Sequence, residues 1–243
     1  MTALIACSHG TRFAEGRATV SEILDLLSLA LPGVRIEPAF VDVEQPEVDD
    51  VVARVAADGP AVVVPLLLST GHHTKVDIGR AVAPYPHVVS AGTMGPHELL
   101  AQALLRRLGE LPGGDAGRRP GDHIVLAAAG SSDPEAVLDV EHMRDLLAEE
   151  LPAPVSIGYG AGAKPRIPRA VAAAREGGAD RVIAASYVLA PGHFANLVLA
   201  AGADQVSAPL GTDPAVISVI AQRYRAAAAA LRHPEPATSA IGA

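Results

Sequence analysis

The chain contains two copies of one sequence pattern, and this repeat restricts its fold more than any other feature. Three segments of the first half have counterparts in the second, namely Leu4–Arg12 with Val125–Asp133, Ile36–Pro46 with Ile157–Pro165, and Val62–His73 with Ile183–Phe194. In 243 residues, such a duplication predicts two similar halves of modest size, joined by a short connection.

Each half alternates short β-branched runs with segments of helical periodicity, which is typical of βαβ units. The fold class predicted is therefore α/β, with a parallel four-stranded sheet flanked by helices in each of two pseudo-symmetric halves. Strands are expected near 3–7, 34–41, 61–68, 87–91, 123–129, 155–159, 181–188 and 204–207. Long helices are expected over about 134–151 and 214–231, while Pro46 and Pro96 suit first helical turns.

The composition of 112–121, rich in Gly and Pro, predicts a linker between the halves. The expected domains are an N-terminal half over 1–111, which carries the site, and a degenerate C-terminal half over 122–233. The tail 234–243 is expected to be disordered.

The formal charge of −8 argues against nucleic acid or an anionic membrane as a partner. The chain has no Trp, and its single cysteine, Cys7, cannot form an internal disulfide. No apolar run approaches the roughly 18 residues that span a bilayer. These features predict a soluble, cytoplasmic protein, and Cys7 is expected to be a small core residue.

Candidate chemical groups follow the first three predicted strands. His9, Glu44 and His73 each come just after a strand, and ligands bind at the carboxyl ends of strands in open parallel sheets. Two imidazoles and a carboxylate suit Fe, Co, Ni or Zn. Taken singly, each residue also has an ordinary reading, as a turn contact, a loop acid or a helix cap.

The second copy of the pattern has lost all three groups. A merely structural role for each of them, as a turn contact, a loop acid or a helix cap, does not explain this joint loss. His9 falls opposite Ala129 or Gly130, Glu44 opposite Ala163, and His73 opposite Phe194. The loss on one side only predicts a single asymmetric site. His72 differs, because its counterpart His193 is also histidine, and a structural role in the turn is expected there.

A second class of function rests on the glycine-rich segment Gly158–Gly162, which follows a predicted strand. It departs from the G-x-G-x-x-G pattern of dinucleotide sites, so a nicotinamide or flavin enzyme is the weaker alternative.

Three motifs together resemble the class II sirohydrochlorin chelatases of the CbiX/SirB type. They are Ser8–Arg12, then Phe40 with Glu44 and Pro46, and finally Pro65–Ile78. The resemblance extends over nearly the whole chain before the tail. It implies flavodoxin-like, chelatase-like halves, and a metal and catalytic site made of His9, Glu44 and His73.

The resemblance also implies the reaction, which is insertion of Fe²⁺ or Co²⁺, with Ni²⁺ also considered, into sirohydrochlorin in sirohaem or cobalamin synthesis. The metal is then a substrate, with no ATP and no tightly bound cofactor. His9 is the expected base for the pyrrole protons, and Glu44 the expected relay. The tetrapyrrole would contact Arg12, Glu44, Lys75 and the loop Leu68, Ser69, Thr70, Gly71, His72 and His73.

Short members of that family resemble one half and pair as homodimers, so the fused length predicts a monomer. A non-catalytic carrier of a tetrapyrrole or a metal, using the same cleft, is the alternative to the enzyme.

Overall fold

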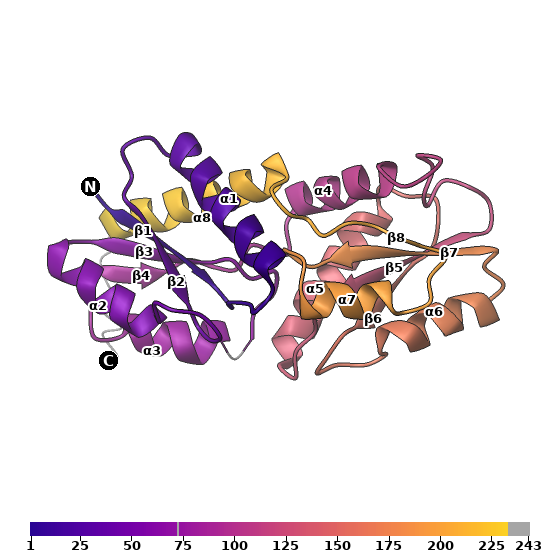
Figure 1. Cartoon of the computed structure of the whole chain (residues 1–243), viewed down its shortest axis with the longest axis horizontal. Helices are drawn as coiled ribbons and strands as arrows, with labels where there is room; N and C mark the ends of the chain where they lie inside the picture. The colour runs from indigo at the N-terminus through magenta and orange to yellow at the C-terminus, as the bar shows by residue number, and fades with distance from the viewer. Residues whose placement is uncertain (72, 233–243) are drawn as a thin grey trace, which may run out of the picture.

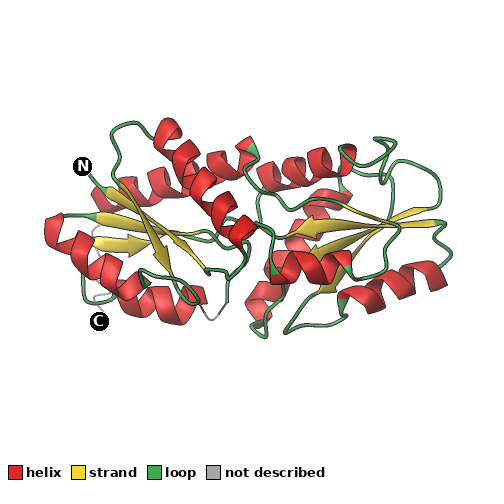
Figure 2. Ribbon diagram, in the orientation of Figure 1, coloured by secondary structure: helices red, strands yellow, loops and turns green. Residues whose placement is uncertain are grey.

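The computed structural model describes residues 1–71 and 73–232 of the chain, and contains two α/β halves side by side along its long axis (Figure 1). In each half, helices lie on both faces of a twisted sheet (Figure 2). The predicted tail 234–243 lies outside the described residues.

The first half is built on a parallel four-stranded sheet in the order β2-β1-β3-β4. Its strands are β1 Ala3–Ser8, β2 Ile36–Phe40, β3 Ala61–Pro65 and β4 Val88–Ser90. The two central strands, β1 and β3, are buried along their whole length. Covering both faces with helices explains why these strands read as continuous apolar runs.

The second half repeats this sheet, also parallel and four-stranded, in the equivalent order β6-β5-β7-β8. Its strands are β5 Asp122–Ala128, β6 Val155–Tyr159, β7 Arg181–Tyr187 and β8 Gln205–Val206. The predicted fold class of two pseudo-symmetric α/β halves is confirmed.

Helices on one face of the sheets exchange between the halves. The last helix within the described residues, α8, packs on β3, β4 and α1 of the first half, whereas α4 packs on β7 and α5 of the second (Figure 1). The helices on this face are α1 Ala14–Ala30, α4 Glu98–Gly109, α5 Pro134–Ala148 and α8 Pro214–Arg232. The apolar core beneath them continues from Leu4 in β1 to Leu126 in β5 without a break.

The opposite faces have separate cores, one for each half. They are covered by α2 Val48–Asp58, the π-helical turn η1 His73–Ile78, α3 Gly79–Val82, α6 Ile167–Glu176 and α7 His193–Leu199.

Two details differ from the sequence expectations. The third strand ends at Pro65, so that 66–68, where strand was predicted, belongs to the loop that follows. Pro46 and Pro96 precede their helices and do not enter the first turn, because the helices begin at Val48 and Glu98, after the N-caps.

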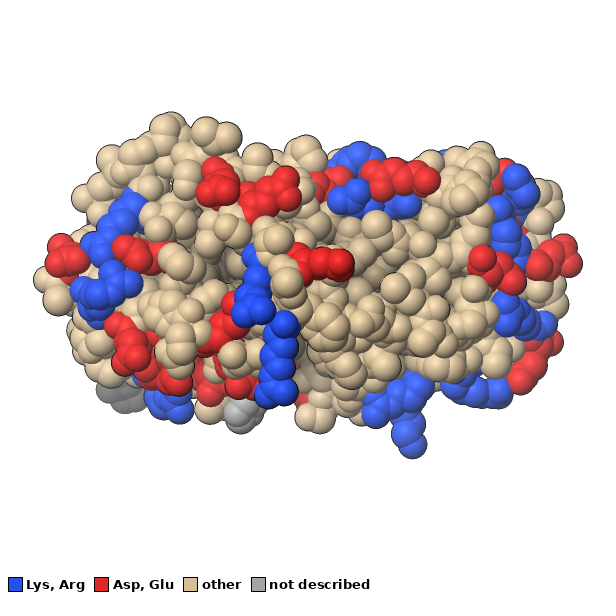
Figure 3. Space-filling view, viewed as in Figure 1, with Lys and Arg blue, Asp and Glu red and all other residues tan. Residues whose placement is uncertain are grey.

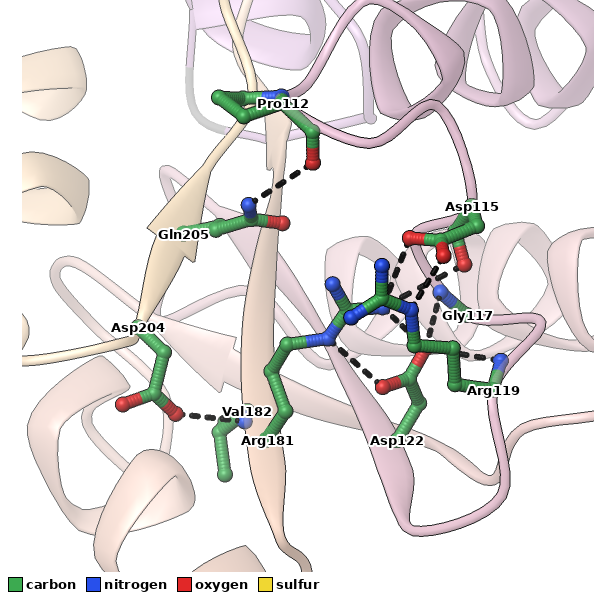
Figure 4. Close-up of polar contacts among 9 residues, drawn as sticks. All are labelled: Pro112, Asp115, Gly117, Arg119, Asp122, Arg181, Val182, Asp204 and Gln205. Atoms are coloured by element: carbon green, nitrogen blue, oxygen red, sulfur yellow. Dashed lines mark hydrogen bonds and ion pairs between the residues drawn. The ribbon is translucent and has the colours of Figure 1, made fainter.

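The connection over 112–121 is held by charged hydrogen bonds to the second sheet (Figure 4). Arg181 donates through Nε and Nη2 to the two carboxylate oxygens of Asp122, each at 2.8 Å, and also contacts Asp115. The guanidinium of Arg181 lowers the pKa of Asp122, against the effect of burial. We propose 1–111 and 122–233 as the two units of the duplication, although α4 and α8 pack across the boundary between them.

Candidate metal and substrate site

The carboxyl edges of the two sheets face each other where the halves meet. Lys75, beyond β3, places its Nζ 2.8 Å from carboxylate oxygens of both Asp133 and Glu135, at the start of α5. Near α1, the carbonyl oxygen of Pro191 lies so close to Gly16 that a β-carbon there would be 2.5 Å from it. The candidate residues of the first half therefore lie beside the second half.

His9 and Glu44 lie at this edge, as predicted. His9 directly follows β1, is half-buried, and has its Nδ1 3.3 Å from the carbonyl oxygen of Gly10. Glu44 follows β2, and its Oε1 accepts a hydrogen bond of 2.7 Å from the backbone N–H of Thr11. This bond ties the loop after β2 to the loop after β1, so the structure brings the two loops that carry these residues together.

Backbone hydrogen bonds align the two halves residue by residue at this point. The N–H of Asp42 donates to the carbonyl of His9, and the N–H of Ala161 donates to that of Ala129. The N–H of Glu44 closes a tight turn on Asp42, as that of Ala163 does on Ala161. His9 therefore corresponds to Ala129, and Glu44 to Ala163.

The turn before Glu44 contains an unusual residue. Val43 has a φ of 65°, the one positive value among the described residues that are not glycine. Its counterpart in the second half is Gly162, with the same φ of 65°. A β-branched side chain in this region costs conformational energy, and such strain concentrates at functional sites.

The corresponding place in the second half is occupied by an aromatic ring. Phe194, the counterpart of His73, packs against Gly160, where a β-carbon would lie 2.9 Å from its Cδ1. The ring of the neighbouring His193 stands edge-on to it, 5.3 Å between centroids. The second half therefore closes with apolar contacts at the position where the first carries its candidate ligands.

The same packing accounts for the glycines of the segment Gly158–Gly162. A β-carbon on Gly158 would lie 2.8 Å from the α-carbon of Ile167, and one on Gly162 would lie 2.2 Å from the backbone of Ser131. Close packing between elements of this half therefore explains these glycines, and a dinucleotide site is not needed to account for them.

The loop after β3 leads into the π-helical turn η1, which begins at His73. Such turns are rare and often occur at functional sites. Where the loop joins η1, the hydroxyl of Thr74 donates to the carbonyl of Gly71 and accepts from the N–H of Gly71. The predicted contact residue His72 and the side chain of His73 lie outside the described residues, so the three-residue ligand set stays a prediction.

The second half holds this loop by two contacts that the sequence reasoning missed. The backbone N–H and the hydroxyl of Thr70 both donate to Oδ2 of Asp139, at 2.7 and 2.8 Å. The hydroxyl of Tyr187 donates to the carbonyl of Leu68, at 3.0 Å. No sequence motif includes Asp139 or Tyr187, because each of these residues contacts a loop that is far away in the sequence.

The predicted basic contacts differ in their surroundings. Hydrogen bonds from Lys75 to Asp133 and then Glu135 raise the pKa of the lysine, so its ammonium is already neutralised from the second half. Arg12 is exposed in the loop after β1. Basic and acidic side chains are interspersed on the face seen in Figure 3, with basic side chains along the seam between the halves.

Cys7 is a core residue, as expected, and is fully buried in β1. Burial, with a contribution from the charge of Asp77, raises the pKa of its thiol to about 12. The thiol therefore stays protonated near neutral pH and is a poor metal ligand.

Among the side chains that the structure describes, which exclude those of His72 and His73, no cluster of three or more His, Cys, Asp and Glu residues has the geometry of a metal site. Across residues 1–71 and 73–232, no helix has the length and apolar character that a membrane span requires.

Solved structures with the same fold cover almost the whole chain. SirB from Bacillus subtilis with Fe³⁺ has a TM-score of 0.77 and 23% identity, over 96% of this chain and 98% of that one. The structure of CbiX, described as the terminal enzyme for biosynthesis of siroheme in denitrifying bacteria, has a TM-score of 0.67 and 20% identity, over 93% and 99%.

Relatives named as sirohydrochlorin chelatases are similar over part of their length. A sirohydrochlorin cobaltochelatase of Priestia megaterium is 29% identical over 167 residues, which are 62% of this chain and 51% of the relative. A sirohydrochlorin ferrochelatase of Bacillus subtilis (strain 168) is 28% identical over 158 residues, 62% of this chain and 59% of the relative. The matches thus span between half and two thirds of these relatives.

The family model named CbiX matches the chain twice, over residues 3–111 and over 123–227. The two matches fall on the two copies of the internal repeat and together cover most of the sequence. The chain therefore belongs to the CbiX family.

Proposed function

We propose that this protein is a sirohydrochlorin chelatase, an ATP-independent lyase that inserts Fe²⁺ or Co²⁺ into sirohydrochlorin. Relatives named for these two activities support the reaction class. The observation that carries the proposal is the one-sided site. Two halves with matching backbones differ in that His9 and Glu44 of the first are Ala129 and Ala163 in the second.

The proposed chemistry uses few ligands of moderate strength. His9, Glu44 and His73 collect the divalent ion, and a site with few protein ligands leaves coordination positions open for pyrrole nitrogens. Two pyrrole N–H protons must leave as the metal enters. A histidine can accept a proton near neutral pH, so we assign the first transfer to His9 and the outward relay to Glu44.

The substrate carries carboxylates, and the protein is acidic overall. We propose that Arg12, Lys75 and the loop backbone over 68–71 receive those carboxylates. Binding at Lys75 then requires that a substrate carboxylate exchange with Asp133 or Glu135, both of which hold its ammonium. His72 and His73 complete the proposed contact loop.

The ion is proposed as a substrate, with no tightly bound cofactor. The relatives favour Fe²⁺ and Co²⁺, and Ni²⁺ is a further ion that the same donor types accept. We also propose that the protein acts as a cytoplasmic monomer, with partners limited to the tetrapyrrole and the metal.

The test is the variant His9→Ala. If His9 both holds the ion and accepts a pyrrole proton, the metallation rate should fall at least ~10²-fold, the low end for loss of a general base. Affinity for metal-free sirohydrochlorin should fall much less, because the loop and basic groups remain. Stopped-flow absorbance gives the rate, and equilibrium titration gives the affinity.

Circular dichroism should show a normally folded His9→Ala protein, because a half-buried residue at a loop start contributes little to the core. A folded variant that still metallates at the normal rate would contradict the assignment of His9. Wild-type protein that binds sirohydrochlorin, yet metallates it no faster than free solution does, would favour the carrier instead.

A further inference from the structure

We propose that Asp139 and Tyr187 of the second half are positioning residues for the reaction in the first half. They hold the loop Leu68–Gly71, which leads directly to the π-helical turn that begins at His73. This inference rests on the proposed function, and it gives the second half a part in catalysis after the loss of its own candidate ligands.

The first contact is a forked one on a single carboxylate oxygen. Thr70 donates its backbone N–H and its hydroxyl to Oδ2 of Asp139, at 2.7 and 2.8 Å. Hydrogen bonds to an ionised acceptor are about twice as strong as neutral ones. The partially buried position of both groups limits competition from water.

The second contact comes from a buried side chain. Tyr187 is 2% exposed, and its hydroxyl donates to the carbonyl of Leu68 at 3.0 Å. Burial, with the charge of Asp139, raises the pKa of this phenol, so it remains a donor at all working pH values. Gly95 makes room for the contact, since a β-carbon there would lie 2.0 Å from the hydroxyl oxygen of Tyr187.

This support acts in one direction only. The backbone alignment that pairs the halves places Pro191 opposite Thr70, and Leu66 opposite Tyr187. Proline has neither the N–H nor the hydroxyl that Thr70 uses, and leucine has no hydroxyl to donate. The second half therefore supports the loop of the first half without a matching bond in return.

Loss of either anchor should lower the fraction of molecules whose loop is correctly placed. Because only that fraction reacts, apparent Co²⁺ affinity and metallation rate should both fall by the factor by which the fraction falls. A substitution that destabilised the whole fold would instead change hydrogen exchange and stability throughout the chain.

The experiment compares Asp139→Ala, Tyr187→Phe and Asp139→Asn with the matched control Glu141→Gln, an exposed carboxylate on the same helix. Hydrogen exchange measures the loop in free protein, without substrate. Exchange of the Thr70 amide should be at least ~10-fold faster in Asp139→Ala, as the loss of a charged hydrogen bond implies. Asp139→Asn, which keeps an acceptor, should lie between Asp139→Ala and the wild type.

The same variants are then titrated with Co²⁺ and assayed for metallation, with kcat and KM determined separately. We expect kcat to fall at least ~10-fold in Asp139→Ala, with the control unchanged and exchange elsewhere unaltered. Unchanged loop exchange in both Asp139→Ala and Tyr187→Phe would overturn the proposal. So would faster loop exchange with normal kcat and normal Co²⁺ affinity.

Failure of the proposed function has a different signature. In that case the wild type itself would not metallate sirohydrochlorin, while loop exchange and Co²⁺ titration would still decide whether Asp139 and Tyr187 position the loop.

Discussion

At the scale of single residues, the two halves differ where chemistry is proposed and agree where the backbone must turn. Gly10 and Gly130 both have positive φ, and a β-carbon on either would lie 2.2 Å from a facing carbonyl oxygen. His9 and Glu44 were predicted correctly to lie at the strand ends, because strand ends can be read from apolar runs. The anchors Asp139 and Tyr187 were not, because contacts between halves have no local sequence signal.

Val43 provides a prediction at this scale. Val43→Gly should raise the free energy of unfolding by about 1 kcal/mol, because relief of strain exceeds the added entropy of the unfolded chain. Val43 is 43% exposed, so little apolar burial is lost. Urea unfolding measures the change. Val41→Gly, two residues earlier and outside the left-handed region, should instead destabilise the protein, and a loss of stability in Val43→Gly would contradict the strain argument.

At the scale of elements, strands and helices followed from periodicity, and the predicted strands agree with the observed ones to within a few residues. The exchange of α4 and α8 could not be predicted, because either half offers the same apolar face to an amphipathic helix. One ion pair joins these two helices. Arg106 in α4 donates to both carboxylate oxygens of Asp213, which also accepts from the N–H of Ala215 and so caps α8.

A pH dependence follows from this cap. Burial, the largest single influence, would raise the pKa of Asp213. The hydrogen bonds from Arg106 and the N–H of Ala215, together with the charges of Arg106 and Arg107, outweigh it and lower the pKa. A carboxylate with a lowered folded-state pKa stabilises the fold above its unfolded pKa of about 4, and loses that effect as the pH falls through the folded value. Asp213→Asn should cost about 1–2 kcal/mol at pH 7, discounted because Arg106 is 48% exposed.

The measurement is urea unfolding of wild type and Asp213→Asn from pH 7 downward. The difference between the two proteins should shrink below about pH 4. Asp145→Asn, a surface carboxylate on α5 with 59% side-chain exposure, serves as the control and should change little at any pH. A difference that persists or grows in acid would argue against the charge of Asp213 as the cause.

At the scale of the whole molecule, the repeat predicted both the pseudo-symmetry and its failure at the site. His73 and His193 allow a direct test, because they lie one register position apart in equivalent turns. His73→Ala should abolish most metal insertion, at least ~10²-fold in rate, if it is a ligand or proton acceptor. His193→Ala should retain most of it, since that exposed side chain packs on Phe194.

Metallation assays with both variants, after matched circular dichroism spectra, measure the contrast. Equal losses would mean that the second half contributes a reacting group, and that the alignment of His73 with Phe194 misplaces the site.

The exchanged helices limit which substitutions the second half can tolerate. The helix Pro214–Arg232 is far in sequence from His9, yet it packs against β3 and β4. The hydroxyl of Tyr224 in this helix also bonds the carbonyl of Thr2. If the proposed site is correct, substitutions in the second half should be tolerated at the place that corresponds to that site. Substitutions in α8 should not be, because they would reshape the sheet that carries the proposed ligands.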